Sequence, residues 1–337
     1  MATLITGGAG YIGSHTIVEM LKDNRDIVVM DNFSNSKPAV LDRIREISGK
    51  DFRFYEADML DKQAMERIFQ ENEIDSCIHF AGFKAVGESV KKPLMYYHNN
   101  IIGTINLCEL LSKYNAKKIV FSSSATVYGK PKSVPIKEDF PLSTENPYGE
   151  TKLMIERILS DLYKSDNEWS ITILRYFNPV GAHISGRIGE DPRGIPNNLM
   201  PYISQVAQGR LSYLNVFGDD YKTHDGTGVR DYIHVVDLAN AHLYALDYTL
   251  KNNVIEHFNI GTGVGYSVLD MINAYQRVTA KNIPYKITTR RPGDVDECYA
   301  DPEKANRVLG WNAKRGLDEM CADADRWQTN NPMGYDK

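Results

Sequence analysis

Short runs of apolar residues alternate with helical patterns through the first half of the chain. Between the first two runs, Ile17, Met20 and Leu21 follow the i, i+3, i+4 spacing of a helix with one buried face. Apolar runs separated by helices are typical of a parallel sheet covered by helices on both faces, so the pattern predicts a doubly wound α/β fold. The runs are Leu4-Ile5, Ile27-Val28-Val29-Met30, Cys77-Ile78-His79-Phe80, Ile119-Val120-Phe121 and Ile171-Thr172-Ile173-Leu174.

The pattern changes after about Asn178. Gly, Pro and Asn become frequent, as in Pro179-Val180-Gly181 and in residues 194–198, and the strand and helix signals are less regular. We therefore expect a larger first domain over residues 1–178 and a smaller C-terminal α/β domain over residues 179–337, whose loops close over a ligand. A returning segment near residues 231–262 is expected to complete the first domain.

Composition narrows the classes of partner. Of the 337 residues, 39 are basic and 44 are acidic, which gives a formal net charge of −5 and no basic stripe for nucleic acid. The first residues lack a basic segment followed by an apolar run, and no later stretch approaches the roughly 20 apolar residues of a membrane span. We expect a cytoplasmic protein that binds neither nucleic acid nor membranes.

The cysteines indicate neither a disulfide nor a metal site. Cys77, Cys108, Cys298 and Cys321 show no Cys-x-x-Cys spacing and no His partner at the intervals of zinc ligands. Reduced thiols are therefore expected.

A glycine pattern at the start of the chain predicts a dinucleotide site. Gly7, Gly10 and Gly13 follow a short strand and open a helix, which is the context that makes this fingerprint credible. Glycines permit the tight turn and the close approach of backbone N–H groups to a pyrophosphate, while the helix N-terminus attracts the anion. An ordinary turn between a strand and a helix is the alternative.

Acidic and polar residues at the following strand ends extend this site. Asp31 ends the second strand, where a carboxylate accepts hydrogen bonds from ribose hydroxyls and repels a 2′-phosphate, which favours NAD over NADP. Asp58 and the run Phe80-Ala81-Gly82 follow the third and fourth strands, and Lys84 and Asn99 are within reach of the same crevice. Each of these taken alone is equally well explained as a cap or a surface residue.

Candidate catalytic groups follow the fifth strand. Ser122-Ser123-Ser124 ends that strand, and Tyr148 and Lys152 lie four residues apart, on one face of the expected helix. A positive charge at Lys152 would favour the Tyr148 phenolate, a base that removes a proton from an alcohol, and a strand-end serine hydroxyl could relay that proton. A solvated helical face and a polar loop are the alternatives.

Together these residues resemble the extended short-chain dehydrogenase/reductase family, and in particular its epimerases of nucleotide sugars. The resemblance covers nearly the whole chain and implies a Rossmann-type fold. The segments that carry it are residues 80–89 (FAGFKAVGES), 121–129 (FSSSATVYG), 175–182 (RYFNPVGA), 195–202 (IPNNLMPY) and 228–234 (GVRDYIH).

The resemblance implies that the first domain binds NAD and the second a UDP-sugar. Tyr148 would be the base at the sugar O4, Lys152 would contact the nicotinamide ribose, and Ser124 would orient the O4 hydrogen. The implied cofactor positions are Gly7, Gly10, Tyr11, Ile12, Gly13, Asp31, Asn32, Asn35, Ser36, Asp58, Met59, Phe80, Ala81, Gly82, Lys84, Asn99, Ser122, Tyr148, Lys152 and Phe177. The implied substrate positions are Lys84, Ser124, Tyr148, Asn178, Asn198, Leu199, Asn215, Phe217, Arg230, Arg291, Asp294 and Cys298.

The activity implied by the resemblance is NAD-dependent 4-epimerisation of UDP-hexoses through a 4-keto intermediate. Dehydratases on the same scaffold carry an Asp-Glu pair after the strand-end hydroxyl residue, whereas this chain has Ala125-Thr126. We therefore expect the chemistry to stop at C4. Two alternatives remain, namely a UDP-sugar dehydrogenase or reductase that exchanges NAD(H) with solvent, and an inactive NAD-binding scaffold.

The residue at position 298 bears on substrate choice. In the family, a bulky Tyr at the matching position excludes an N-acetyl group at C2 of the sugar, and a small residue leaves room for it. Cys298 therefore implies activity on UDP-GlcNAc and UDP-GalNAc as well, although a shift of one residue in the match would place Tyr299 there. A buried structural thiol is the alternative.

A homodimer is the expected assembly. The helix that follows Tyr148 carries two adjoining apolar stripes, a wider apolar face than one sheet contact requires. A helix buried deeply within one subunit is the alternative, but related enzymes pair through this helix and the preceding one. The residues concerned are Ile155, Leu159 and Leu162 on one stripe, Met154 and Ile158 on the other, and Ile101, Ile105 and Cys108 on the preceding helix.

Overall fold

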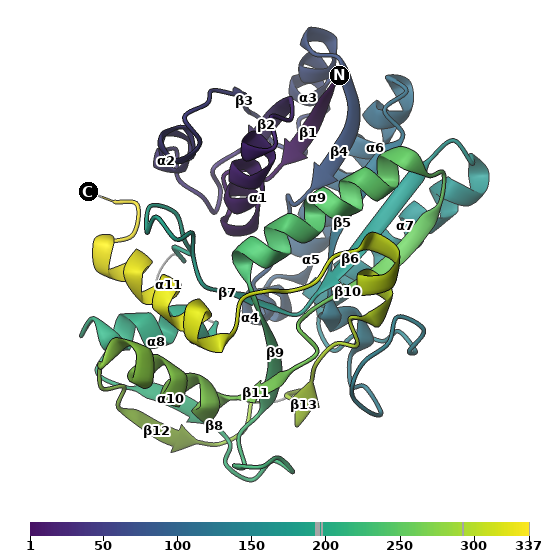
Figure 1. Ribbon diagram of the computed structural model, residues 1–337. Helices are drawn as coiled ribbons and strands as arrows, with labels where there is room; N and C mark the ends of the chain where they lie inside the picture. The colour runs from purple at the N-terminus through teal and green to yellow at the C-terminus, as the bar shows by residue number, and fades with distance from the viewer. Residues whose placement is uncertain (193–195, 197, 292, 337) are drawn as a thin grey trace.

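The computed structural model describes residues 1–192, 196, 198–291 and 293–336 (Figure 1). Its largest element is a seven-stranded sheet in which every strand runs parallel to its neighbours, in the order β10-β6-β5-β4-β1-β2-β3. This order places β1 beside β4, where the chain changes its winding direction. The strands are β1 (Ala2–Thr6), β2 (Ile27–Asp31), β3 (Arg53–Glu56), β4 (Ile74–His79), β5 (Lys118–Ser124), β6 (Ser170–Tyr176) and β10 (Ile255–Ile260).

Both faces of this sheet are buried, which explains the continuous apolar runs. Ile5 and Val29 contribute to the core on one face, and their neighbours Leu4 and Val28 contribute to the core on the other. The predicted doubly wound α/β fold is confirmed, and all five apolar runs lie in strands or extend one residue beyond them. β3 carries no apolar run, because this edge strand is half-buried or exposed along its length.

Helices cover the two faces of the large sheet (Figure 1). On one face lie α1 (Tyr11–Lys22), α2 (Ala39–Ser48) and α9 (Val235–Lys251), and on the other α3 (Lys62–Glu71), α6 (Gly103–Lys113) and α7 (Pro147–Ser165). Shorter helical segments are α4 (Val86–Lys91), α5 (Pro93–Tyr97), η1 (His98–Ile102), η2 (Ala125–Tyr128) and η3 (Ala305–Leu309). No helix within the described ranges is long and apolar enough to cross a membrane.

Two smaller sheets form the lower part of Figure 1. β9 (Val229–His234) pairs with β7 (Asn178–Val180), β11 (Gly265–Ser267) and β13 (Glu297–Cys298), while β8 (Leu214–Phe217) pairs with β12 (Tyr285–Thr288). The helices of this part are α8 (Leu199–Ala207), α10 (Val268–Thr279) and α11 (Leu317–Asn330). Their apolar faces share a separate core that includes Met200, Val216, Ile272 and Met320.

The chain returns to the large sheet after β9. α9 covers one face of that sheet, and β10 then pairs with β6 along its whole length. β9 itself belongs to the smaller sheet, so the return begins with α9. The division into domains at residue 178 stays a prediction.

A buried carboxylate in β9 connects the smaller sheet to the segment that returns to the large sheet. Asp231 in β9 accepts hydrogen bonds from the backbone N–H groups of Thr262 (2.8 Å), Gly263 (3.0 Å) and Ala300 (3.1 Å). It therefore fixes β9 to the turn after β10 and to the segment after β13. Because burying an unpaired carboxylate is costly, these three donors are what makes the position tolerable.

Candidate active site

The predicted cofactor and catalytic residues lie at the same edge of the large sheet. In a parallel sheet the carboxyl ends of all strands meet at one edge, where an open α/β sheet binds its ligands. The glycine loop follows β1, and Asp31 ends β2. The run from Phe80 follows β4, and the serine run ends β5. Segments distant in the sequence thus converge on one region.

The glycine loop between β1 and α1 has no room for side chains. Gly7 has φ +69°, and a Cβ there would lie 2.7 Å from the backbone N of Ala81. A Cβ at Gly13 would lie 2.5 Å from the Gly7 carbonyl oxygen. Gly10 caps α1 without any side-chain hydrogen bond, so the first N–H groups of this helix are left for an anion. The loop therefore fits a dinucleotide pyrophosphate.

Gly8 is a fourth glycine of the loop, and the sequence pattern assigned it no role. A Cβ at Gly8 would lie 2.5 Å from Val29 Cγ1 and 2.9 Å from Ile17 Cδ1. Gly8 thus lets the loop pack against β2 and α1. The two residues after Gly10, Tyr11 and Ile12, open the helix.

Asp31 is fastened to the glycine loop. Its carboxylate accepts hydrogen bonds from Ala9 N (3.0 Å), Phe33 N (2.9 Å) and Ser36 Oγ (2.8 Å). Burial raises the pKa of Asp31, and these hydrogen bonds oppose that rise. The carboxylate lies at the end of β2, beside the loop, where the sequence placed it.

A second pair of polar residues joins the ends of β2 and β3. Asn32 Nδ2 donates to Asp58 Oδ2 (2.8 Å), and Asp58 Oδ1 accepts from Leu60 N (2.8 Å). Met59 is buried, and a Cβ at Gly103 of α6 would lie 2.8 Å from its Cβ. Asn35 is exposed and lies in the loop after β2.

Asn100, which sequence reasoning missed, holds the segment after β4. Its side chain accepts from Phe83 N (2.8 Å), donates to Phe83 O (3.1 Å) and donates to Thr151 Oγ1 of α7 (3.0 Å). The neighbouring Asn99 also donates to it (3.0 Å). Asn100 therefore links the Phe80–Lys84 segment to the helix of Tyr148. Only its burial distinguishes it from Asn99, and the sequence carries no signal for that.

Lys152 is buried at the end of β5. Its Nζ donates to the Ser122 carbonyl oxygen (2.6 Å) and lies 6.0 Å from the centre of the Tyr148 ring. Burial lowers the pKa of Lys152 to about 8, and the negative charge of Glu156 opposes this. The amine therefore remains mostly protonated at neutral pH.

The electrostatics of Tyr148 differ from the expectation. Burial raises the pKa of the phenol, and the Ser124 hydroxyl acts against that rise through a hydrogen bond. Loss of solvation is the larger of these two effects, so the pKa of the phenol lies above its usual value in the protein alone. The structure brings Ser124, Tyr148 and Lys152 together, and burial of the phenol acts against the phenolate in the protein alone.

Residues from the two parts of the molecule meet at Glu190. Its Oε1 accepts from Lys84 Nζ (3.2 Å) and from Asn198 Nδ2 (3.0 Å). Asn198 is exposed and precedes α8, whose first residue is Leu199. The predicted cofactor residue Lys84 and the predicted substrate residue Asn198 therefore share one acidic partner.

Four other predicted substrate residues form a cluster. Arg291 pairs with Asp294 (Nε to Oδ2, 2.9 Å) and lies 5.0 Å from the centre of the Phe217 ring. Arg230 Nη1 donates to Val295 O (2.9 Å), and its Nη2 lies 3.8 Å from Asp294 Oδ1. Two guanidinium groups beside one carboxylate leave positive charge for a diphosphate. Asn215 is half-buried on β8, the strand that ends in Phe217.

Cys298 lies on the side of β13 that faces η2. It packs against the apolar cluster that includes Phe177 and the η2 residue Val127, while Tyr299 lies against Gly265, where a Cβ would lie 3.0 Å from Tyr299 Cδ1. Neighbouring residues of an extended strand point to opposite sides. Burial raises the pKa of the Cys298 thiol to about 11, so it is uncharged.

The remaining predicted residues and the cysteines are placed as follows. Asn178 is exposed at the start of β7, directly after the buried Phe177. The four cysteines are free thiols. Within the described ranges, His224, Asp225 and Asp270 hold ligand atoms within 4.8 Å of one another, but both carboxylates bond to Ser267 at the start of α10.

Comparisons with known proteins agree over the length of the chain. Residues 4–324 match the family model described as GDP-mannose 4,6 dehydratase. The UDP-glucose 4-epimerase of Bacillus subtilis (strain 168) is 64% identical over 335 residues, 99% of both chains.

Solved structures agree as well. The UDP-glucose 4-epimerase of Bifidobacterium longum, in complex with NAD+ and UDP, is 53% identical with a TM-score of 0.96, and the match covers 99% of this chain and 100% of that one. The UDP-Glc/GlcNAc 4-epimerase of Campylobacter jejuni is 38% identical with a TM-score of 0.86, over 98% and 99% of the two chains. On these matches and on the geometry described above, the chain belongs to the UDP-glucose 4-epimerase family, within the extended short-chain dehydrogenases/reductases.

Proposed function

We propose that the chain is an NAD-dependent epimerase that interconverts UDP-glucose and UDP-galactose by inverting C4 of the sugar. The observation that carries the proposal is the placement of Ser124, Tyr148 and Lys152 at the same sheet edge as the glycine loop. The relative from Bacillus subtilis supports it through 64% identity, and the relative from Bifidobacterium longum was solved with NAD+ and UDP.

We assign the cofactor to the glycine loop and the strand ends around it. The close contacts at Gly7 and Gly13 leave a cradle of backbone for the pyrophosphate, and Asp31 faces the loop where a ribose would lie. When bound, NAD supplies a reversible hydride acceptor and a positive charge near Tyr148. That charge would favour the phenolate and oppose the effect of burial on the pKa of the phenol.

The protein groups then act on the sugar hydroxyl. Tyr148 accepts the O4 proton as C4 loses its hydride, which leaves a ketone at C4, and returns that proton when the hydride comes back to the other face. Ser124 orients the hydroxyl and relays the proton, and the Lys152 ammonium holds negative charge on the phenolate. No net oxidation results.

We place the UDP group at the arginine cluster of the second part. Arg230 and Arg291 provide forked donors for the diphosphate, and the Phe217 ring lies beside Arg291. With the diphosphate anchored there, the ketosugar can rotate about its link to the phosphate and present its other face.

Dehydration is disfavoured, although the matching family model carries the name of a dehydratase. Removal of water across C5 and C6 needs an acid and a base near those atoms. The residues that follow Ser124 are Ala125 and Thr126 in η2, and neither carries a carboxylate. The reaction should therefore end at C4.

We further propose that the site accepts N-acetylated sugars. Cys298 packs against the cluster that includes Phe177 and the η2 residue Val127, which supports a place near the segment that follows Ser124, and Tyr299 lies on the opposite side of the strand. A small thiol leaves space where a larger side chain would meet the substituent at C2. The relative from Campylobacter jejuni is described as acting on both UDP-Glc and UDP-GlcNAc.

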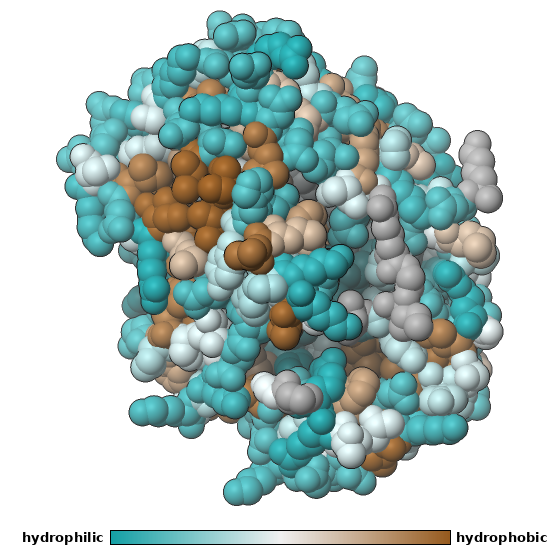
Figure 2. Space-filling model, turned by 180° about the vertical axis from the view of Figure 1, so that it is seen from behind, coloured by the Kyte–Doolittle hydropathy of each residue, from teal (hydrophilic) through white to brown (hydrophobic). Residues whose placement is uncertain are grey.

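A cytoplasmic homodimer is the assembly that we propose. Figure 2 shows hydrophobic side chains gathered on the face that is turned away in Figure 1. The sequence expectation needs one change, because Ile155, Leu159 and Cys108 are buried within the subunit. The apolar residues left exposed on the helices of this region are Val86, Val90, Leu94, Ile102 and Met154.

The purified protein is expected to convert UDP-galactose to UDP-glucose, and Tyr148→Phe should lower kcat at least about 100-fold with the fold intact, because it removes only the oxygen that accepts the proton. Coupled assays and circular dichroism check this. Near-normal turnover in the variant would exclude Tyr148 as the base. Oxidation that depends on added NAD, or NAD binding without turnover, would favour the dehydrogenase or the scaffold.

Cys298→Tyr should suppress turnover of UDP-GlcNAc selectively, by about tenfold or more, while turnover of UDP-glucose is largely kept, because the larger ring meets the N-acetyl group. The ratio of kcat/KM for the two substrates measures this effect. Cys298→Ser is the matched control, and it should keep both activities. Equal losses for both substrates, or no N-acetyl activity in the parent, would contradict the proposal.

The parent is expected to have the mass of a dimer at micromolar concentration, as measured by sedimentation. Ile102→Glu combined with Met154→Glu should shift it to a monomer, because two charges would be buried in the proposed interface. Ile184→Glu, at an apolar residue that is 62% exposed in the loop after β7, is the control. A monomeric parent would rule out the dimer.

A further inference from the structure

Four residues after Lys152 on α7, Glu156 is a carboxylate that water scarcely reaches. Its side chain is 3% exposed, as is that of its partner Arg175 on β6. Arg175 donates through Nε to Oε1 (3.1 Å) and through Nη2 to Oε2 (2.7 Å), and the Ser123 hydroxyl donates to Oε1 as well. Burial of a carboxylate costs several kcal/mol unless it is paired in this way.

The contact with Ser123 joins Glu156 to the catalytic strand end. Ser123 lies between Ser122, whose carbonyl accepts from Lys152, and Ser124, whose hydroxyl bonds to Tyr148. Movement of Ser123 would therefore displace both contacts. A single carboxylate thus fixes the strand end against the helix that carries Lys152.

Glu156 is also the negative charge that faces Lys152. The other titratable groups that face this lysine are Tyr148 on α7 and His79 on β4. Burial lowers the pKa of His79 to about 3 and raises that of Tyr148, so both are neutral near pH 7. Glu156 opposes the effect of burial on Lys152, whose pKa would otherwise fall further below about 8.

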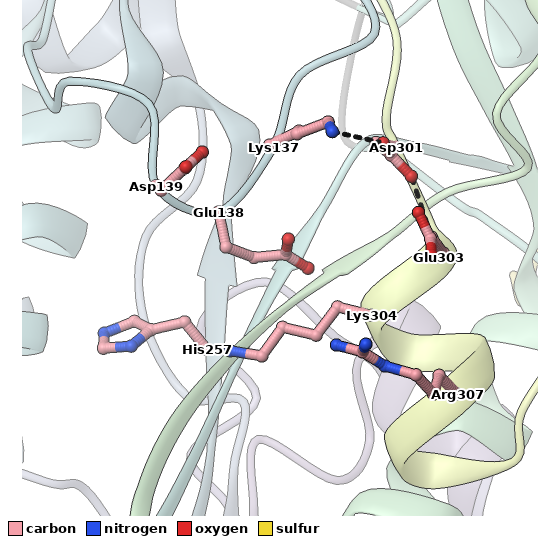
Figure 3. Close-up of a pocket in the computed structure, with 8 residues that line it drawn as sticks. All are labelled: Lys137, Glu138, Asp139, His257, Asp301, Glu303, Lys304 and Arg307. Carbon is pink, nitrogen blue, oxygen red and sulfur yellow. Dashed lines mark hydrogen bonds and ion pairs between the residues drawn. The ribbon is translucent and has the colours of Figure 1, made fainter.

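Arg175, which holds Glu156, has further polar partners of its own. Its Nη1 donates to Tyr128 Oη (2.9 Å) and to Glu138 O (3.1 Å), and His257 Nε2 lies 3.8 Å from Glu156 Oε2. Figure 3 shows Glu138 and His257 beside a hollow that also holds acidic and basic side chains. That hollow contains no residue of the candidate active site, and we take it as the solvent end of the network.

We propose that Glu156 is a positioning residue of the reaction, which anchors the Ser122–Ser124 strand end and the Lys152 ammonium beside Tyr148. The inference rests on the proposed function, but it concerns a residue that touches neither the sugar nor the cofactor in that proposal. Its effect passes through Lys152 and Ser123, so it should change how activity depends on pH more than how tightly substrate binds.

The direct test is the titration of Lys152 in Glu156→Gln. Lysines labelled with ¹³C at Cε are followed by NMR, and Lys152→Met assigns the resonance. The pKa of Lys152 is expected to fall below that of the parent by about one unit or more, because an opposing charge is lost in a buried site. An unchanged pKa in the folded variant would overturn the inference.

The kinetic test follows the alkaline limb of kcat. In Glu156→Gln this limb should move to lower pH by about the same amount as the pKa of Lys152. The KM for UDP-galactose should change little. Glu156→Asp keeps the charge, so its alkaline limb should lie close to that of the parent. Asp161→Asn, at an exposed residue of the same helix, should leave the pH of the limb unchanged.

A double variant separates positioning from stability. Glu156→Gln leaves Arg175 buried without its charged partner and is expected to reduce stability for that reason alone. Glu156→Gln with Arg175→Gln removes both charges and should recover stability, while the lower Lys152 pKa persists. Recovery of kcat and of the Lys152 pKa together with stability would overturn the inference. A parent without epimerase activity would refute the proposed function, and the NMR titration would still decide the role of Glu156.

Discussion

The hydrogen bond from Lys152 to the Ser122 carbonyl is the contact on which the rest of the site depends. It fixes the helix that carries Tyr148 to the end of β5, and parallel pairing through β4 places that strand end at the same sheet edge as the glycine loop. All strands of a parallel sheet end at one edge. The order of the strands is therefore enough to bring the cofactor and catalytic groups together there. The site is a consequence of the sheet.

The large sheet and the centre of the site could be predicted from sequence because their signals are local. Apolar runs mark strands that are buried on both faces, and the spacing of Tyr148 and Lys152 follows from the period of a helix. The signal of the glycine loop is equally local, since Gly7, Gly10 and Gly13 follow one another at intervals of three residues. These features need no knowledge of distant partners.

The supporting residues could not be predicted, because their roles arise from distant contacts. Asn100 gains its role from Phe83 and Thr151, and Glu156 from Ser123 and Arg175, with no motif to mark either. Spacing also shows that Lys152 is on the same helix face as Tyr148, but it does not show how deeply the phenol is buried, and burial raises the pKa of the phenol. Burial is a property of the whole fold, and it decides the pKa.

These observations describe a site that is built to move a hydride off C4 and to return the same hydride to the opposite face. The most direct test is conversion of UDP-galactose to UDP-glucose in D₂O, with the product analysed by NMR and mass spectrometry. The account predicts a product that carries hydrogen, not deuterium, at C4, because the hydride never exchanges with solvent. Deuterium at C4 would contradict it.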